Sequence, residues 1–364
     1  MLPKTLVFSL MAAAGLASTT YDVSVIPAPS GFANLTISGI NDSGQVAGYG
    51  QTGSIEQAFI GSPSGSTAIP LPPPLGIATF TNSFAYAIND LGQVAGYGLT
   101  NYANQGALAF IGTASGSAAI PMPANWVWDS NGEFGFAVND IGQVAGRVSG
   151  YELGFSPEPE QAFFGTAATS ATFIPSGWFY GSGNAINDAG VVCGSVENST
   201  GTTEEAFVGN GVFQFSGWSN SYCYALNDSG DWAGNGYNGA ASQAFFDGAP
   251  IPLPTGATLS SVYLGSLNNS GFVVGNSDAG GWIWDATDGT VLLNSLLAVS
   301  GWNVYDAISI SNNGLILAIA SYEGGPQQYV ELSAATPEPG TFILAGAGLL
   351  LAAFVYRKRY RTVG

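Results

Sequence analysis

The sequence predicts an all-β fold, a seven-bladed β-propeller whose blades have four strands each. A short phrase, Asn-Asp-x-Gly or a close variant, follows an apolar or β-branched run along most of the chain. Its seven copies end at Gly44, Gly92, Gly142, Gly190, Gly230, Gly271 and Gly314, at intervals of 40 to 50 residues. A period of about 40 to 50 residues that carries only strand signals fits four short strands and their turns. We therefore expect one closed ring and not two separate domains.

Each phrase predicts a β-hairpin. In residues 87–98, an apolar run enters, Asn89-Asp90-Leu91-Gly92 turns, and the chain leaves with alternating polarity. Asn and Asp tolerate turn geometry and bond their own backbone, and glycine accepts the positive φ that closes a short loop. The phrase therefore marks the connection between the first two strands of each blade.

Two further runs complete each repeat. The third run carries x-Ala-Phe, at residues 57–59, 108–110, 161–163, 205–207 and 243–245, with variants at 281–284 and 328–330. The fourth run is marked by prolines, as in residues 68–72, 119–123, 173–175 and 250–254. Proline cannot donate to a strand ladder, so we expect the fourth strand at the outer edge of each blade.

The last repeat tests whether the ring closes. It has only three runs, which end at residue 332, whereas residues 23–29 near the start look like an orphan fourth strand. If this segment pairs with residues 328–332, the N-terminus completes the last blade and no sheet edge stays open where the chain ends meet. The sequence therefore predicts a ring closed by its own N-terminal strand.

The charge balance excludes some partners and chemistries. The chain has 24 acidic and 6 basic residues, and Arg147 is the only cation between residues 5 and 356. A domain with this much negative charge repels the phosphate backbone of a nucleic acid, so we expect no nucleic-acid partner. No histidine is present, which removes the commonest general base and the usual zinc ligand.

Both ends have the composition of targeting segments. Residues 1–20 have the charged start, apolar run and small-residue exit of a signal peptide, so the propeller is expected over residues 21–335. In residues 336–364, the motif Pro337-Glu338-Pro339 precedes an uncharged segment, residues 341–356. The basic residues Arg357, Lys358, Arg359 and Arg361 follow. We expect a short transmembrane helix over 341–356 with the basic end in the cytoplasm.

This C-terminal end resembles the PEP-CTERM sorting tail of Gram-negative bacteria, and Pro337, Glu338 and Pro339 match its motif residue for residue. The resemblance implies export, processing by a membrane-embedded exosortase, and a cell-surface or matrix destination. A plain membrane anchor is the alternative. The repeated Asn-Asp-x-Gly-Gln-Val-x-Gly with a later x-Ala-Phe resembles the HAF-repeat family of exported proteins. Here Gln, Leu or Glu replaces the family's histidine, and the family has no established enzymatic activity to transfer.

The acidic residues offer two kinds of site. The Asn-Asp turns supply hard oxygen ligands suited to calcium, but one carboxylate per turn, with blades separating the copies, favours turn chemistry. Two nearby carboxylates can hydrolyse a glycoside. Pairs occur at Asp129 and Glu133, Glu158 and Glu160, Glu204 and Glu205, and Asp285 and Asp288. None lies in a recognisable catalytic frame, so we expect solvated loop charges, no catalytic residues, no metal and no cofactor.

The tryptophans between repeats suggest a binding face. Trp178, Trp218 and Trp302 each lie in Ser-Gly-Trp, 12 residues before a turn glycine, and Trp126 lies in the same connection of another repeat. These connections are expected on the same face as the variable loops between second and third strands, residues 98–106, 146–160 and 194–204. Flat amphipathic rings suit sugar stacking or protein contact. The alternative is that they pack between blades.

Cys193 and Cys223 lie in neighbouring repeats. In an exported protein they can form a disulfide, and as two small apolar side chains they can also stay free. The sequence leaves this choice open.

These observations predict an exported, exosortase-sorted surface or matrix propeller that is not an enzyme and that binds exopolysaccharide or surface proteins. A purely structural surface protein without a ligand differs only in lacking a defined partner. The alternative function is a polysaccharide-active hydrolase or lyase that uses carboxylates on the loop-rich face.

Overall fold

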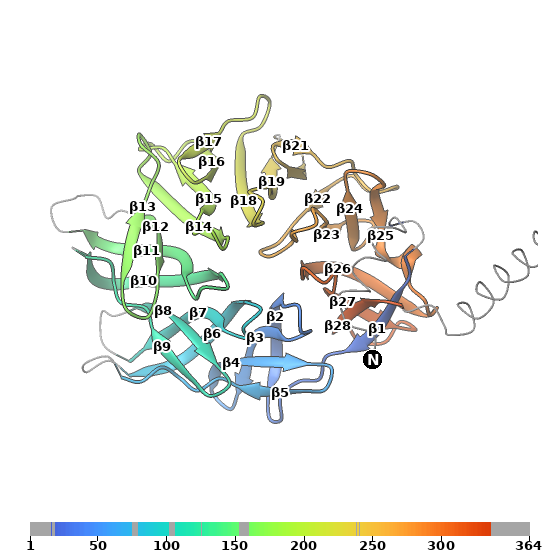
Figure 1. Ribbon diagram of the computed structural model, residues 1–364, viewed down its shortest axis with the longest axis horizontal. Coiled ribbons are helices and arrows are strands. Elements are labelled where there is room, and N and C mark those ends of the chain that lie inside the picture. Colours follow the sequence, from blue (N-terminus) through green and yellow to red (C-terminus); the bar gives the residue numbers. More distant parts are fainter. Residues whose placement is uncertain are drawn as a thin grey trace, which may run out of the picture.

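The computed structural model describes Leu16 and residues 19–74, 79–101, 106–124, 126–152, 160–237, 239 and 241–335. This part of the chain is all-β, apart from a short 3-10 helix, η2 (Leu293–Leu296). Its strands form twisted sheets that follow one another around a central axis, and the N-terminal strand lies beside the last sheet (Figure 1).

Consecutive strands pair antiparallel in groups of four. The first three groups are β2 (Ala33–Ile40), β3 (Val46–Thr52), β4 (Ile55–Ser62) and β5 (Gly65–Ala68); β6 (Phe80–Ile88), β7 (Val94–Thr100), β8 (Ala107–Thr113) and β9 (Gly116–Ala119); and β10 (Trp126–Val138), β11 (Val144–Glu152), β12 (Glu160–Gly165) and β13 (Ser170–Phe173).

The same order continues around the ring. The next groups are β14 (Tyr180–Ile186), β15 (Val192–Glu197), β16 (Glu204–Val208) and β17 (Gly211–Phe213); β18 (Asn220–Leu226), β19 (Trp232–Tyr237), β20 (Ser242–Phe246) and β21 (Ala249–Pro250); and β22 (Ser260–Ser261), β23 (Val273–Ser277), β24 (Trp282–Asp285) and β25 (Gly289–Leu292). The last group combines β26 (Trp302–Ile310), β27 (Ile316–Tyr322) and β28 (Gln328–Ala334) with β1 (Tyr21–Val25).

The N-terminal strand closes the last sheet, as the sequence predicts. β1 pairs antiparallel with β28 from Tyr21 opposite Ala334 to Val25 opposite Val330. The contact extends beyond the strands, because the Ala335 amide donates to the Thr20 carbonyl at 2.8 Å. The pairing leaves no open edge at β28.

The repeated turns form the predicted hairpins. In the second group, the Asn89 amide donates to the Gln93 carbonyl and the Gly92 amide donates to the Asn89 carbonyl, at 2.9 and 3.0 Å. Gly92 has a φ of +73°, a conformation that side chains with a Cβ rarely adopt. The turn residues therefore set the hairpin geometry locally.

The core lies between neighbouring groups. The phenylalanines of the x-Ala-Phe runs are at most 2% exposed; they are Phe59, Phe110, Phe163, Phe207 and Phe245. Phe110 of β8, for example, packs with Ala58 and Ile60 of the preceding group. Burying one such ring stabilises the fold by about 1.5 to 3 kcal/mol. The repeated phenylalanine thus holds adjacent groups together.

The outermost strands are shorter than the sequence predicts. β5 and β9 end at Ala68 and Ala119, so the prolines expected within the fourth strand follow it. Proline has no amide proton to continue the ladder, which explains the early end. The proline carbonyls accept instead: Ser66 Oγ donates to the Pro27 carbonyl at 2.9 Å, and Ser117 Oγ to the Pro70 carbonyl at 2.5 Å.

Cys193 and Cys223 form a disulfide, with a Cα–Cα distance of 5.8 Å. The bond joins β15 to β18 in the next group, and both residues are fully buried. The choice that the sequence leaves open is therefore decided by how two strands of neighbouring groups face each other.

No helix within residues 19–335, as far as the structure describes them, is long and apolar enough to cross a membrane. The expected transmembrane helix over 341–356, the motif Pro337–Pro339 and the basic residues 357–361 lie outside the described residues. The expected signal peptide, residues 1–20, lies largely outside them as well.

Candidate functional site

The Asn-Asp turns meet around the central axis. In the first six turns, the backbone amide of the second residue donates a hydrogen bond to a side-chain oxygen of the next turn, at 2.8 to 3.0 Å. The acceptors are Asp90, Asp140, Asp188, Asp228, Asn269 and Asn312 in order, and the Asn313 amide completes the circle on Asp42. The expectation that blades keep these residues apart is wrong, because the turns lie at the inner ends of the sheets.

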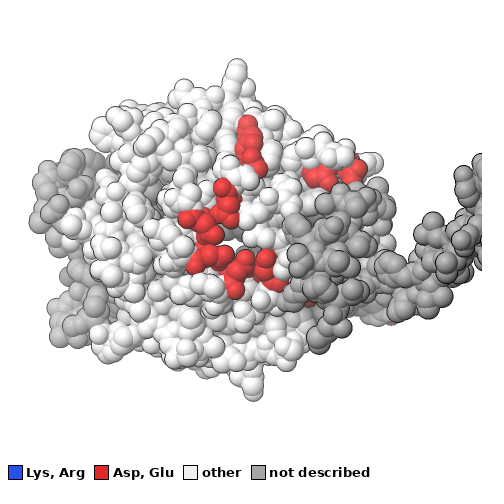
Figure 2. All heavy atoms as spheres, viewed as in Figure 1, with Lys and Arg blue, Asp and Glu red and all other residues white. Residues whose placement is uncertain are grey.

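These turns surround a cavity of about 180 Å³ that the innermost strands line. Figure 2 shows acidic side chains gathered around the central opening on this face. Burial raises the pKa of Asp90 and of Asp140 above the usual value, and neighbouring aspartates add to this effect. Since the side-chain oxygens accept hydrogen bonds from backbone amides, the circle of turns has a structural role. Among the described residues, no cluster of three or more acidic or cysteine side chains has an arrangement for a metal ion.

Aromatic rings pack along the inner strands of the first three groups. Tyr86 of β6 lies 5.8 Å from Tyr97 and 5.9 Å from Phe136, measured between ring centroids. The guanidinium of Arg147 lies 5.0 Å from the centroid of Phe134, close enough for a cation–π contact. This cluster anchors the only cationic side chain between residues 5 and 356.

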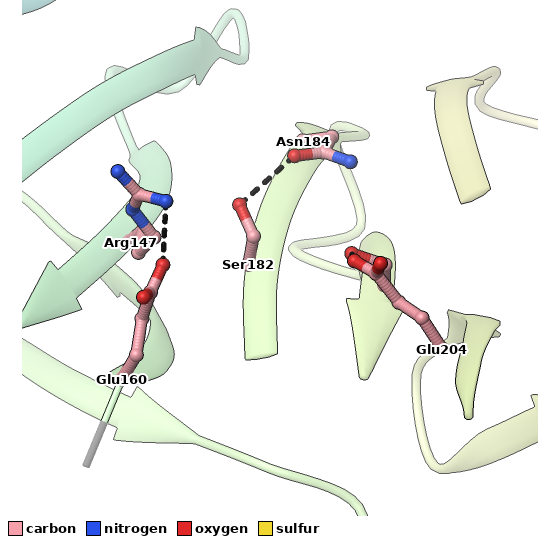
Figure 3. A network of polar contacts seen from close by, with 6 residues as sticks. Arg147, Glu160, Ser182, Asn184 and Glu204 are labelled. Atoms are coloured by element: carbon pink, nitrogen blue, oxygen red, sulfur yellow. Dashed lines mark hydrogen bonds and ion pairs between the residues drawn. The ribbon is translucent and has the colours of Figure 1, made fainter. Parts of the chain in front are cut away.

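Arg147 points from this cluster into a polar pocket of about 280 Å³ between the third and fourth groups. We call this the polar pocket, and its lining residues are Arg147, Glu160, Tyr180, Gly181, Ser182, Ser195, Glu197 and Glu204. Figure 3 shows Arg147 and Glu160 on one side, Ser182 and Asn184 on β14, and Glu204 on the other side.

Strand register explains how these residues come together. Tyr180, at the start of β14, lies opposite Glu197, at the end of β15, and Glu197 lies opposite Glu204, at the start of β16. Glu160 opens β12 in the preceding group. The pocket thus lies at the ends of these strands away from the Asn-Asp turns, beside the connections that the sequence predicts to be variable loops.

The pocket's charged groups have different partners. Arg147 Nη1 lies 2.5 Å from Glu160 Oε1, and both side chains are a little more than one third exposed. Glu204 accepts two hydroxyl hydrogen bonds, from Ser195 Oγ at 3.0 Å and from Tyr222 Oη at 2.8 Å. Burial raises the pKa of Glu197, and the charges of Glu204 and Glu160 raise it further.

Behind the pocket, hydrogen bonds between side chains and backbone hold its wall in place. Ser182 Oγ donates to Asn184 Oδ1 at 3.0 Å, and Asn184 Nδ2 donates to the Cys223 carbonyl at 2.9 Å. Burial and the Glu204 carboxylate raise the pKa of Tyr222, so its hydroxyl stays protonated and donates. Cys223, one end of the disulfide, directly follows Tyr222 in β18. The disulfide therefore lies next to the residue whose hydroxyl donates to Glu204.

Of the four candidate carboxylate pairs, Glu204 with Glu205 and Asp285 with Asp288 have both side chains described. Glu204 faces the pocket, whereas Glu205 is buried and accepts from Ser221 Oγ at 3.1 Å. Asp285 Oδ1 accepts the Asp288 amide at 2.7 Å within a turn. Glu158 lies outside the described residues, and nothing is described of the Asp129 side chain. The observed set, Glu160, Glu197 and Glu204, comes from three strands.

Glu133 of β10 is a separate, buried acid. Its side chain is 0% exposed, and neither carboxyl oxygen has a partner at hydrogen-bonding geometry. Burial raises the pKa of Glu133 well above its usual value, and the facing Ala109 amide offsets only part of that effect. A neutral carboxyl is the form that such a position favours.

The tryptophans predicted to form a ligand face pack against the protein. Trp126 is 7% exposed and belongs to a core cluster. Trp178 and Trp302 are partly buried against the cores beside them, and Trp218 covers Gly236. Their role in ligand binding stays a prediction.

Sequence reasoning did not single out Phe179, which is 57% exposed beside Tyr180 and whose amide donates to the Glu197 carbonyl.

Comparison with solved structures shows a distant likeness in fold. Two oligogalacturonate lyase structures, one in complex with manganese and one from Vibrio parahaemolyticus, align with TM-scores of 0.47 and 0.48. The first is 11% identical and covers 88% of this chain and 97% of its own length. The second is 10% identical and covers 89% of this chain and 93% of its own length. Puromycin hydrolase aligns with a TM-score of 0.51 and 10% identity over 84% of this chain and 54% of its own. This likeness concerns the fold alone.

No curated protein matches the chain. The resemblance of the repeats to HAF-repeat proteins therefore has no support from the comparisons and stays a prediction. One family model does match: the PEP-CTERM protein-sorting motif, over residues 335–359. The chain thus carries a PEP-CTERM sorting motif, which indicates an exported protein that an exosortase processes and sorts to the cell surface or extracellular space of a Gram-negative bacterium.

Proposed function

We propose that the protein is a seven-bladed β-propeller of the cell surface or extracellular matrix that binds a polysaccharide, without catalysis, through the polar pocket. The blade count is supported by the seven repeated turns, by the successive four-stranded groups and by the pairing of β1 with β28. The observation that carries the binding role is the polar pocket itself.

The pocket has the features of a small sugar site. Its lining offers hydroxyl, carboxylate and guanidinium groups to ligand hydroxyls. Its volume of about 280 Å³ is close to the lower end of the range for ligand pockets, about 300 Å³. It therefore suits one sugar unit of a chain and not a large ligand.

The PEP-CTERM motif supports the location. A protein sorted to the outer surface meets the polysaccharides of that surface, and its processing by an exosortase removes the need for a permanent membrane anchor. The uncharged segment 341–356 and the basic residues that follow hold the chain in the membrane before processing.

Glycan binding by the full chain, kept in detergent, tests this proposal. We expect extracellular polysaccharide fragments to bind, and we expect Ser182→Ala, which removes a hydroxyl from the pocket lining, to weaken the binding by about tenfold, or about 1.4 kcal/mol. A variant with alanine at Trp178, Trp218 and Trp302 tests the tryptophans separately. If no fragment binds, the protein is better described as a structural surface protein without a ligand.

A second candidate is a polysaccharide hydrolase or lyase. The observation that favours it is the gathering of Glu160, Glu197 and Glu204 in one pocket, with the Tyr222 hydroxyl on Glu204. Carboxylates in such a group can serve as acid and base toward a glycosidic bond. Release of shorter sugars from a bound polysaccharide, abolished by Glu204→Gln, would establish this function in place of the noncatalytic one.

A further inference from the structure

The polar pocket has an unbalanced charge. It contains three carboxylates and one guanidinium, and Arg147 is paired with Glu160. The chain has no histidine, and it has no other Lys or Arg between residues 5 and 356. No further cationic side chain of the described domain is therefore available for Glu197 or Glu204.

The partners of Glu204 in the structure are hydroxyl groups. Ser195 and Tyr222 donate to its two oxygens, and neither brings a positive charge to the pocket. Glu197 lies beside it in the strand pairing, opposite Glu204 and Tyr180. Two like charges close together favour any ligand that brings a positive charge between them.

The geometry points to a ligand with both hydroxyl groups and a protonated amine. We propose that the polar pocket recognises a free-amine amino sugar, such as the de-N-acetylated hexosamine unit of a polysaccharide, through Glu197 and Glu204. This inference rests on the proposed glycan-binding function and names its substrate class. Ser182 and Ser195 serve the sugar hydroxyls, and the Arg147–Glu160 pair forms the opposite wall.

The same charges disfavour acidic sugars. A uronate would place a third uncompensated carboxylate beside Glu197 and Glu204, on a chain whose net charge is already −18. Arg147 is paired with Glu160 and stacked over Phe134, so its positive charge is already balanced by a carboxylate. The pocket therefore separates amino sugars from uronic acids by charge.

Calorimetric titration of the full chain, in detergent and at physiological salt, tests the inference with three short ligands. These are a glucosamine disaccharide, its N-acetylated counterpart and a galacturonate disaccharide. We expect the free amine to bind at least about tenfold more tightly than the acetylated sugar, and the uronate to bind most weakly.

Two variants separate the pocket from the general acidity of the surface. Glu197→Gln removes a pocket carboxylate, and Asp22→Asn removes an exposed one on β1. We expect Glu197→Gln to weaken glucosamine binding about tenfold and Asp22→Asn to change it less than about twofold. Comparing the free-amine sugar with its N-acetylated counterpart tests the effect of the positive charge without any change to the protein.

The outcomes distinguish the two proposals. If the acetylated sugar or the uronate binds as tightly as the free amine, the amine inference is overturned and glycan binding stands. Equal losses in the two variants also overturn it, because the attraction is then a property of the whole surface. If none of these ligands binds and no other glycan does, both proposals fail.

Discussion

The Asp42 carboxylate accepts a hydrogen bond from the backbone amide of Asn313 at 2.8 Å, across 271 residues of sequence. Asn313 Nδ2 also donates to the Asp42 carbonyl at 3.0 Å. These contacts join the last turn to the first and complete the circle of turns around the axis. Ring closure therefore occurs twice, here at the axis and again at the β1–β28 pairing.

Removing the Asp42 acceptor is expected to weaken the closure at the axis. Asp42→Ala should lower the free energy of unfolding by about 1 to 2 kcal/mol, because the part-buried Asn313 amide loses its acceptor. Asp42→Asn keeps an acceptor oxygen and should cost less. Urea unfolding measures both, and an alanine variant as stable as the asparagine variant would contradict the role of this bond.

Substitutions of Tyr21 test how much the buried ring on the closing strand, β1, contributes to stability. The side chain is 0% exposed, and its hydroxyl has no hydrogen-bond partner. Tyr21→Ala should cost about 3 to 5 kcal/mol because it leaves a cavity under β1. Tyr21→Phe should be neutral or slightly stabilising, because it removes an unsatisfied hydroxyl. The midpoints of denaturant unfolding compare the two, and a large loss in the phenylalanine variant would mean that the hydroxyl has a partner.

The disulfide between Cys193 and Cys223 is expected to stabilise the fold by about 3 to 4 kcal/mol. It closes a segment with a sequence separation of 30 residues, and it joins strands of two neighbouring groups. The double variant Cys193→Ala, Cys223→Ala should lose that amount in denaturant unfolding. A reductant should destabilise the parent protein similarly and leave the double variant unchanged; an equal effect on both would refute the assignment.

Glu133 should make stability fall as the pH rises. Burial raises the pKa of Glu133 in the folded protein, so its neutral form is the one compatible with the fold. Its contribution is fully present below the unfolded pKa, about 4.3, and is lost as the pH rises through the higher folded pKa. Glu133→Gln should remove this part of the pH dependence and stabilise the protein near neutral pH.

Melting temperatures across the range from about pH 4 to pH 8 measure the effect. Raised pKa values of Asp90, Asp140, Glu197 and Glu205 act in the same direction, so the parent protein and the Glu133→Gln variant must be compared directly. Asp22→Asn serves as the surface control. Parallel curves for the parent and Glu133→Gln would show that Glu133 does not titrate in this range.

The sorting tail should be separable from the ring. Deleting residues 337–364 removes the Pro-Glu-Pro motif but leaves both β28 and its partner β1. We expect a secreted protein with an unchanged β-sheet circular dichroism spectrum and with no exosortase processing. Loss of the β-sheet signal would show that the fold depends on the tail.

Much of the fold was predictable because its signals are local. The turn at Asn89–Gly92 forms from residues that favour it, and the period between such turns predicted the four-stranded groups. An orphan strand was recognisable at residues 23–29 because the last repeat lacked a fourth run, and the observed strand, β1, begins and ends earlier, at Tyr21–Val25. The prolines of the first two groups were expected inside the fourth strand, but they follow it, since the ladder ends before the first residue that lacks an amide proton; Pro250 does lie within β21.

The site was less predictable because its members come from different sheets. Arg147 stood out as the only cation between residues 5 and 356, and Glu160 and Glu204 stood out as acids beside variable connections. Their meeting with Glu197 depends on how the third group faces the fourth, which no local pattern encodes. The same is true of Cys193 and Cys223, which required the facing of β15 and β18.

The sequence by itself determined the all-β class, the repeated hairpins, the closing strand and the sorting motif, because these depend on neighbouring residues and on a regular period. Only the tertiary structure decided the circle of turns, the disulfide and the polar pocket. Those features arise where curvature of the ring brings side chains of adjacent sheets within a few ångströms, and curvature is a property of the packed sheets together.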